Sequence, residues 1–301
     1  MQTSFVPVFF VENSSCVDAA ISTVVETLAH YGFEFSRTPE AFDVGGLLGA
    51  GGTSFVVEAI QREDGRPVTL KILNPRSAIG KYQAVASFAI EIIVGSYVST
   101  KSMISHASYG RHGDEIFIVR ESADKITPEF TDNLSPTELG LHFSQYCDSI
   151  LNLHNEGFAA VDVVPSNFLR CTRGVVFGDI GSARRTRHDA VGSDAINEVI
   201  SRISSAGNCE LHHAAIVPEC AMSQDIAGLG LIFYETLTGQ KVPGAENFPY
   251  VSDKCLRIAR PSFVNPRAPA VFDEIVQQML RQLTSPVPSK LADFARQLRS
   301  I

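Results

Sequence analysis

Residues 160–167 read AVDVVPSN, and this short stretch decides how the rest of the chain is interpreted. Its two functional side chains are the carboxylate of Asp162 and the carboxamide of Asn167, five positions apart with Pro165 between them. An aspartate on a loop can accept a hydroxyl proton, and an asparagine can supply an oxygen to a metal ion. The stretch therefore has the polar side chains of a catalytic loop in an otherwise apolar setting.

Length, composition and charge restrict the class of protein. The chain has 301 residues, enough for two lobes with a real core, and its 45% hydrophobic and 19% charged fractions are ordinary for a globular protein. Its formal net charge is −8, and the sequence has no basic stripe. Since nucleic-acid binders usually carry such a stripe, no nucleic-acid partner is expected.

The spacing of the cysteines and the length of the apolar runs indicate the cellular compartment in which the protein is expected. The six cysteines include no C-x-x-C pair, which favours a reducing environment. No apolar run approaches 18 residues, so no membrane span is expected. The start, MQTSFVPVFFVENSS, lacks a basic segment and is interpreted as a strand rather than a signal peptide. We expect a cytoplasmic protein, with secretion into a host cell as the open alternative, and the oligomeric state is not predicted.

Apolar spacing predicts the order of secondary structure. Helical spacing indicates an amphipathic helix at residues 16–30, and alternation between 42 and 73 indicates strands. A helix with a broad apolar face follows, then a strand at 116–122. After Pro136 the chain is mostly helical. A β-rich first part followed by a helical second part predicts two lobes.

Two stretches of the first part could carry chemistry. In LGAGGTSFVV, Gly49 and Gly51 let backbone N–H groups approach a phosphate, although most glycine-rich turns are only turns. In VTLKIL, Lys71 is the only charge of an apolar strand and needs an anionic partner if it is buried. Glu91, twenty residues on, is the candidate; the alternative is an edge-strand lysine that points into solvent.

A third acidic position follows the opening stretch. Asp179-Ile180-Gly181 begins twelve residues after Asn167, and an aspartate at a strand end is a natural ligand for phosphate-bound Mg²⁺. Each polar residue also has an ordinary alternative. Asp162 could cap a turn, Asn167 could form an Asx-turn, and Glu91 could lie on the surface of its helix.

Taken in order, these stretches resemble the signature of the protein kinase family. The matching segments are Gly49 to Val56, Val68 to Lys71, Glu91, Ala160 to Asn167, Asp179 to Gly181, Val217-Pro218-Glu219 and Asp225 to Gly230. The resemblance covers about residues 43–300 and implies a bilobal α+β protein-kinase-like fold. Residues 43–122 would form a β-rich N-lobe with one regulatory helix, residues 123–301 a helical C-lobe, and residues 1–42 an extension of a strand and an amphipathic helix.

The resemblance also implies ATP and Mg²⁺ as cofactors and a role for each matched residue. The residues implied to bind the nucleotide are Gly49, Gly51, Ser54, Val56, Lys71, Leu169 and a hinge from Glu121 to Ala123, with Glu91 positioning the lysine. Asp162 would accept the proton of the attacking hydroxyl, and Asn167 and Asp179 would hold Mg²⁺.

Several positions depart from the family pattern. Ala160 and Val161 replace the histidine and arginine before the aspartate, and Val164 replaces the lysine of the serine/threonine kinase loop. That lysine would contact the γ-phosphate, a contact worth a few kcal/mol. The cations that could substitute are Arg184, Arg185 and Lys81. Arg120 falls at the gatekeeper position, so either the register shifts by one or the back wall of the pocket is polar.

Three functions follow from this pattern. The first is ATP- and Mg²⁺-dependent phosphorylation of protein serine or threonine, since Pro165-Ser166 resembles the serine/threonine version of the loop. A protein substrate would then dock near residues 182–219. The second, motivated by Val161 and Val164, is a pseudokinase that binds nucleotide or a partner protein and signals as a scaffold. The third is a small-molecule phosphotransferase or nucleotidyl transferase on the same fold.

Overall fold

The computed structural model describes residues 19–74, 81–98, 101–126, 131–187, 189–190, 192–207, 218–242, 258–283 and 290–301. The strand expected at the start of the chain lies outside these residues. The chain divides into two compact units. The first consists of Met1–Tyr97, Ile104–Ala123 and Gly192–Ala214, and the second of Val98–Met103, Asp124–Val191 and Ala215–Ile301.

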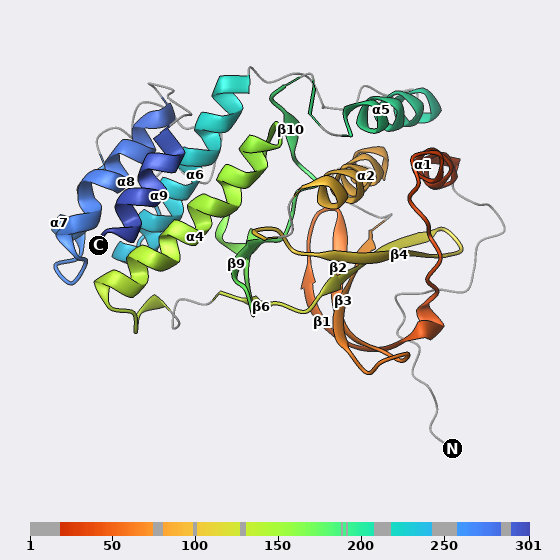
Figure 1. The fold of residues 1–301 in the computed structure, drawn as a ribbon, viewed down its shortest axis with the longest axis horizontal. Helices are drawn as coiled ribbons and strands as arrows, with labels where there is room; N and C mark the ends of the chain where they lie inside the picture. Colours follow the sequence, from red (N-terminus) through yellow and green to blue (C-terminus); the bar gives the residue numbers. More distant parts are fainter. Residues whose placement is uncertain are drawn as a thin grey trace. The chain divides into compact units, whose positions relative to one another are not determined.

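A five-stranded antiparallel sheet forms the first unit's centre (Figure 1). Its order is β1-β2-β3-β5-β4, with bounds β1 Phe42–Ala50, β2 Ser54–Gln61, β3 Pro67–Leu73, β4 His106–His112 and β5 Glu115–Glu121. The strands predicted between residues 42 and 73 and at 116–122 are thus confirmed. Short turns join β1 to β2 and β2 to β3, which suits antiparallel neighbours.

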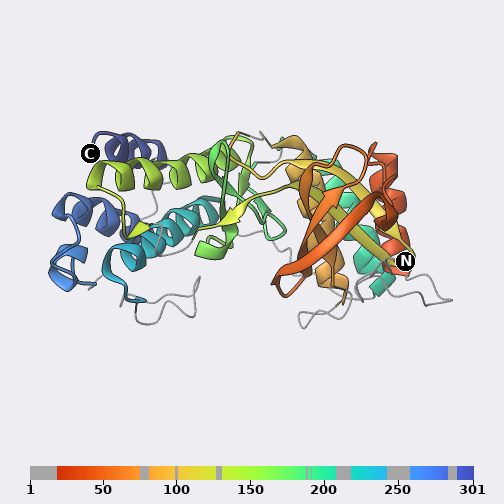
Figure 2. The same ribbon diagram turned by 90° about the horizontal axis from the view of Figure 1, so that it is seen from below.

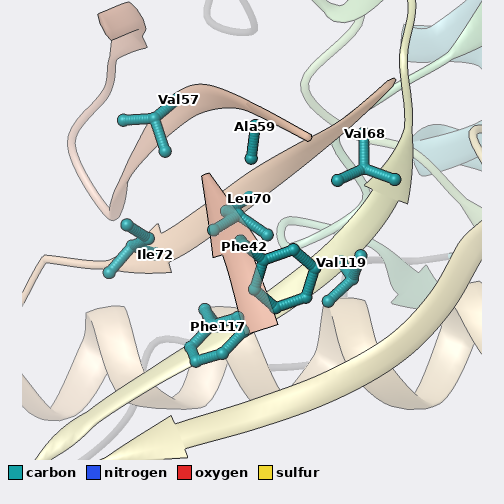
Figure 3. Packing of buried hydrophobic residues seen from close by; sticks show 8 residues of the cluster. All are labelled: Phe42, Val57, Ala59, Val68, Leu70, Ile72, Phe117 and Val119. Atoms are coloured by element: carbon teal, nitrogen blue, oxygen red, sulfur yellow. The ribbon is translucent and has the colours of Figure 1, made fainter. Parts of the chain in front are cut away.

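The two faces of this sheet have different contents. Figure 3 shows one hydrophobic cluster, made of Phe42, Val57, Ala59, Val68, Leu70, Ile72, Phe117 and Val119. Successive residues of a strand point to opposite faces. Thr69 and Lys71 on β3, and Arg120 on β5, therefore lie on the face opposite this cluster.

Helix α2, Lys81–Tyr97, is buried on all sides over residues 84–95. Such a helix must be covered by other elements around its whole circumference. It contacts β3 and β4, and it also contacts α1, Ala19–His30, and α5, Ser193–Gly207. Figure 1 shows α1, α2 and α5 near one another in the first unit.

Helix α1 confirms the amphipathic helix expected at residues 16–30, and α5 lies within the segment 182–219. The apolar faces of α1 and α5 pack against each other, and the Tyr31 hydroxyl donates to Glu198 Oε2 at 2.9 Å. Residues 192–207 therefore pack with the first unit although they follow a long stretch of the second.

The second unit is mainly helical (Figure 2). Its longer helices are α4 Pro136–Asn155, α6 Pro218–Thr238, α8 Asp273–Leu280 and α9 Leu291–Arg299, with short turns at α7 Pro261–Val264, η5 Ala270–Phe272 and η6 Arg281–Leu283. Ser135 and Glu138 form a capping box at the start of α4. α9 packs along α4, where a Cβ on Gly140 would lie 2.5 Å from the Leu298 carbonyl.

Short strands of the second unit flank the stretch 160–167. β7, Phe158–Ala159, precedes it and pairs with β10, Arg184–Arg185. The 3₁₀ turn η2, Pro165–Asn167, ends it, and β8, Phe168–Cys171, follows and pairs with β9, Gly174–Phe177. β6, Asp124–Lys125, adds to the other edge of β8. A β-rich unit and a helical unit confirm the predicted α+β class.

The apolar content of the helices gives no sign of a membrane span. Among the helices within the described residues, none is both long enough and apolar enough to cross a bilayer.

Candidate functional site

The strand lysine of the sequence pattern is buried and paired. Lys71 Nζ on β3 lies 2.5 Å from Glu91 Oε2 on α2, and both side chains are 2% exposed. A buried ion pair of this kind persists only where geometry and hydrogen bonds offset the loss of hydration. The alternative of an edge-strand lysine in solvent is therefore wrong, and Glu91 is not a surface residue.

Arg120 joins the same carboxylate from a second strand. The sheet register places Arg120 opposite Thr69, and its Nη1 lies 3.5 Å from Glu91 Oε1. Its side chain is 5% exposed. The structure therefore places the charged Arg120 side chain on the same face of the sheet as Lys71, in contact with Glu91. Lys71, Glu91 and Arg120 thus form one buried charged group.

His106 on β4 lies opposite Arg120 in the sheet. Burial, together with the nearby positive charges of Arg120 and Lys71, lowers the pKa of His106 to about 3. The imidazole is therefore neutral at physiological pH. The sequence analysis did not predict His106, because nothing near it in the chain indicates that it faces two buried cations.

The glycine-rich segment forms the hairpin between β1 and β2. Gly49 pairs with Val56, and the Gly51 N–H donates to the Ser54 carbonyl at 2.8 Å. A Cβ on Gly51 would meet nothing closer than that oxygen, at 3.8 Å. The turn itself thus does not require this glycine, while the bare backbone leaves room for a ligand to approach. Leu48 beside it is 39% exposed, an apolar position that the sequence analysis did not single out.

The expected hinge begins where β5 ends. The Glu121 N–H donates to the Ser105 carbonyl, and its side chain accepts from the Ser105 N–H at 2.8 Å. Thr69 Oγ1 donates to the Glu121 carbonyl at 3.4 Å. Ala123 follows, at the end of the first unit's second segment. These contacts fix the backbone direction at Glu121.

Asp162 and Asn167 come together on the loop of the second unit. Asn167 Nδ2 donates to the Asp162 carbonyl at 2.9 Å and to its Oδ2 at 3.3 Å. This arrangement turns the amide nitrogen of Asn167 toward Asp162, so its Oδ1 points another way. Asp162 is exposed, which leaves its carboxylate accessible to a hydroxyl group.

A buried aspartate of α6, Asp225, accepts hydrogen bonds from the backbone of the loop that carries Asp162. Asp225 accepts the Ala160 and Val161 N–H groups, each at 2.7 Å, and lies 2.8 Å from His154 Nε2. Val161 has φ of 69°, the one positive value among the non-glycine residues that the structure describes. Such a conformation in a β-branched residue is strained and needs support from its surroundings. Asp225 begins one of the segments that match the family pattern, whereas its partner His154 was not predicted from the sequence.

Asp179 lies next to Asn167 through the backbone. The Gly178 N–H donates to the Asn167 carbonyl at 2.7 Å, and Asp179 Oδ1 accepts from the Gly181 N–H at 3.2 Å. A Cβ on Gly178 would lie 2.7 Å from Leu169 Cδ1, so glycine allows this close approach. Asp179 and Asn167 thus occupy neighbouring positions on two adjacent segments.

The oxygens of Asn167 and Asp179 suit Mg²⁺, which binds proteins through one or two side-chain oxygens and completes its shell with water and phosphate. The orientation of the Asn167 amide fits that role because its nitrogen is already directed to Asp162. No group of three or more His, Cys, Asp or Glu side chains that could hold a metal occurs within the described residues.

The cations suggested as substitutes for the missing lysine lie in different places. Arg184 on β10 is opposite Ala159, and its guanidinium donates to the Ser182 carbonyl at 3.0 Å. Burial lowers the pKa of Arg184. Arg185 is beside it, whereas Lys81 begins α2 of the first unit. In the segment 217–219, Val217 lies outside the described residues, and Pro218 begins α6.

Comparisons with known proteins agree on one family. A family model described as "Protein kinase domain" matches residues 42–292. The chain is 24% identical over 238 residues to the serine/threonine-protein kinase PknL of Mycobacterium tuberculosis, a match that covers 77% of this chain and 56% of PknL. It is 24% identical over 262 residues to the serine/threonine-protein kinase PKH1 of Saccharomyces cerevisiae, covering 80% of this chain and 32% of PKH1. The chain thus spans between a third and slightly more than half of these relatives.

A solved structure agrees with the fold. The kinase domain of PknI from Mycobacterium tuberculosis superposes with a TM-score of 0.55 at 17% identity, over 89% of this chain and 98% of that one. The expected protein-kinase-like fold is confirmed.

Proposed function

The chain belongs to the protein kinase family, and from this premise we propose that it transfers the γ-phosphoryl group of ATP to a serine or threonine hydroxyl of a protein. The observation that carries the proposal is the buried ion pair between Lys71 and Glu91. Burying an ammonium group in an apolar interior costs several kcal/mol of free energy unless the charge is compensated, so a buried lysine indicates a functional role. Binding nucleotide phosphates is such a use.

The first unit supplies most of the proposed nucleotide-binding groups, and Leu169 of the second unit is assigned with them. Lys71 donates to the α- and β-phosphates while Glu91 fixes its position. Backbone N–H groups near Gly49, Gly51 and Ser54 cover the phosphates. In the same assignment Val56 and Leu169 hold the adenine ring, and the backbone from Glu121 to Ala123 hydrogen-bonds its edge.

The second unit supplies the acceptor side of the reaction. Asp162 orients the attacking hydroxyl and accepts its proton, with Asn167 holding the Asp162 side chain in place. Asn167 and Asp179 would hold Mg²⁺, which would supply positive charge beside the phosphates of ATP. Asp225 keeps the loop backbone in the strained form that presents Asp162.

The test is incubation with radiolabelled ATP and Mg²⁺, followed by measurement of label on the chain and on added proteins. Asp162→Ala should remove the label, and so should Lys71→Met. Asp293→Asn is a matched control, because Asp293 is an exposed carboxylate of α9 paired with Arg296 in the same unit as Asp162. Full labelling by Asp162→Ala would contradict the assignment.

A scaffold function is the second candidate, favoured by two apolar replacements in the loop. Val161 and Val164 stand where the family has an arginine and a lysine, so transition-state charge loses a partner. A scaffold predicts thermal stabilisation by Mg²⁺-nucleotide without turnover. Mass spectrometry of the products also separates phosphoryl from nucleotidyl transfer, and labelled small molecules would indicate a small-molecule acceptor.

The segment 182–219 is the proposed docking region for a protein substrate. Within it the apolar face of α5 is already packed against α1 and α2. The faces of α5 that stay accessible carry Asn197, Ser201 and Arg202, which are exposed. Substitution of Arg202 should therefore change KM for a protein substrate and leave KM for ATP unchanged.

A further inference from the structure

Glu91 is shared by two cations that come from two different strands. Its Oε2 contacts Lys71 of β3 at 2.5 Å, and its Oε1 contacts Arg120 of β5 at 3.5 Å. All three side chains are at most 5% exposed. The carboxylate therefore links α2 to two neighbouring strands at once.

We propose that Arg120 is a positioning residue: its contact with Glu91 keeps the Glu91 carboxylate within reach of Lys71. The effect of Arg120 on catalysis rests on the proposed function, whereas its effect on α2 does not. The proposal follows from the sheet register, which puts Arg120 on the same face as Lys71, and from the contact of its guanidinium with Glu91 Oε1.

The physical reason lies in what happens when Lys71 binds a phosphate. A lysine that turns part of its hydrogen bonding toward an anionic ligand weakens its hold on Glu91. A buried carboxylate that loses a partner is strongly destabilised. Because Arg120 contacts the second oxygen of Glu91, the carboxylate keeps a cationic partner while Lys71 binds a phosphate. The position of α2 then does not depend on Lys71 alone.

An arginine suits this position better than a lysine would. Its guanidinium is planar and permanently charged, and it carries several donors in a fixed arrangement. Arg120 is held on β5 opposite Thr69 on one side and His106 on the other. The neutral imidazole of His106 adds no further charge beside it.

The first test needs no catalytic activity. Hydrogen exchange of the amides at residues 84–95 is compared between the wild type, Arg120→Met and Arg62→Met. Arg62→Met is the matched control, because Arg62 is an exposed arginine of the same unit, paired with Asp43. Loss of a buried charge partner should speed exchange in α2 by about tenfold or more, while the control leaves it unchanged.

The second test asks whether Arg120 acts through Glu91. The ATP kcat/KM is measured for Arg120→Met, Glu91→Gln and the double variant. Arg120→Met should lower kcat/KM by about tenfold in the wild-type background and by less than about twofold in the Glu91→Gln background, since linked residues are non-additive. Arg120→Lys, which keeps a cation, should recover part of the loss. A residue that only fills space would give equal losses in both backgrounds.

The outcomes separate the two proposals. Unchanged exchange in α2 of Arg120→Met, or equal losses in both backgrounds, would overturn the role of Arg120. A wild type that turns over no ATP would refute the proposed function, and hydrogen exchange would still decide the role of Arg120. Should Arg120→Met fail to fold, Arg120→Gln and Arg120→Lys replace it, and equal α2 exchange in these two would refute the inference.

Discussion

The sharpest prediction concerns Asp225→Asn. The aspartate gives its two oxygens to three partners: Val161 N–H on Oδ1, and Ala160 N–H with His154 Nε2 on Oδ2. Asparagine has one oxygen and one NH₂ group. Whichever way the amide turns, its NH₂ group faces at least one backbone N–H, donor against donor.

The magnitude follows from these contacts. Each hydrogen bond to a charged group is worth about 1.5–3 kcal/mol, and an unsatisfied buried donor adds a penalty of similar size. We expect a loss of roughly 3 kcal/mol in the free energy of unfolding, or a fall in Tm of roughly 6–12 °C. The loop also loses the support of its strained Val161, and such displacement of a catalytic group can cost about a hundredfold in rate.

The assay combines thermal unfolding with ADP release at a temperature well below either Tm. Asp273→Asn is the control, because Asp273 is a buried carboxylate of the same unit that accepts the Ser262 N–H at 2.9 Å and the Ser262 hydroxyl. It should lower Tm without changing kcat. An Asp225→Asn protein with an unchanged Tm, or an equal fall of kcat in both variants, would refute this reasoning.

Three further predictions use other parts of the structure. The pKa of His106 is about 3 in the folded state and near 6.5 in the unfolded state, so below pH 6.5 the unfolded chain binds more protons than the folded one. His106 should therefore lower the free energy of unfolding by about 2 kcal/mol as the pH falls from 7 to 5. Chemical denaturation at a series of pH values should show a smaller loss over this range for His106→Phe. Val164→Lys should raise kcat by about tenfold in the ADP-release assay if no other cation contacts the γ-phosphate; an unchanged kcat would mean that one does. Val199→Ala, at a buried position of α5, should cost about 1–3 kcal/mol in denaturation and speed hydrogen exchange in α1 and α2; unchanged exchange would contradict the contact between these helices.

Much of this architecture could be predicted from the sequence because it depends on local patterns. The helical spacing of apolar residues predicted α1, and alternation predicted the strands between residues 42 and 73. The order of Lys71, Glu91 and Asp162 along the chain indicated the family, since each motif is short and can be recognised from neighbouring residues alone. The pairing of Lys71 with Glu91 was the simplest way to compensate a buried charge, and it is present.

Other features depend on contacts between distant residues, which periodicity does not encode. The amphipathic pattern of the helix at 193–207 does not say which unit this helix packs against. Arg120 was recognised as unusual, yet only the sheet register shows that it shares the carboxylate of Glu91. His154 and Asp225 are 71 residues apart, and neither residue's neighbours indicate the other.

The return of α5 to the first unit has a consequence for synthesis on the ribosome. The sheet and α2 are complete in the nascent chain by residue 121, but a wall of α2 is supplied by residues 193–207. Until those residues emerge, α2 presents apolar side chains to water or to a chaperone. In a polypeptide that ends at residue 123, this apolar surface of α2 would stay exposed permanently. We therefore expect such a fragment to aggregate.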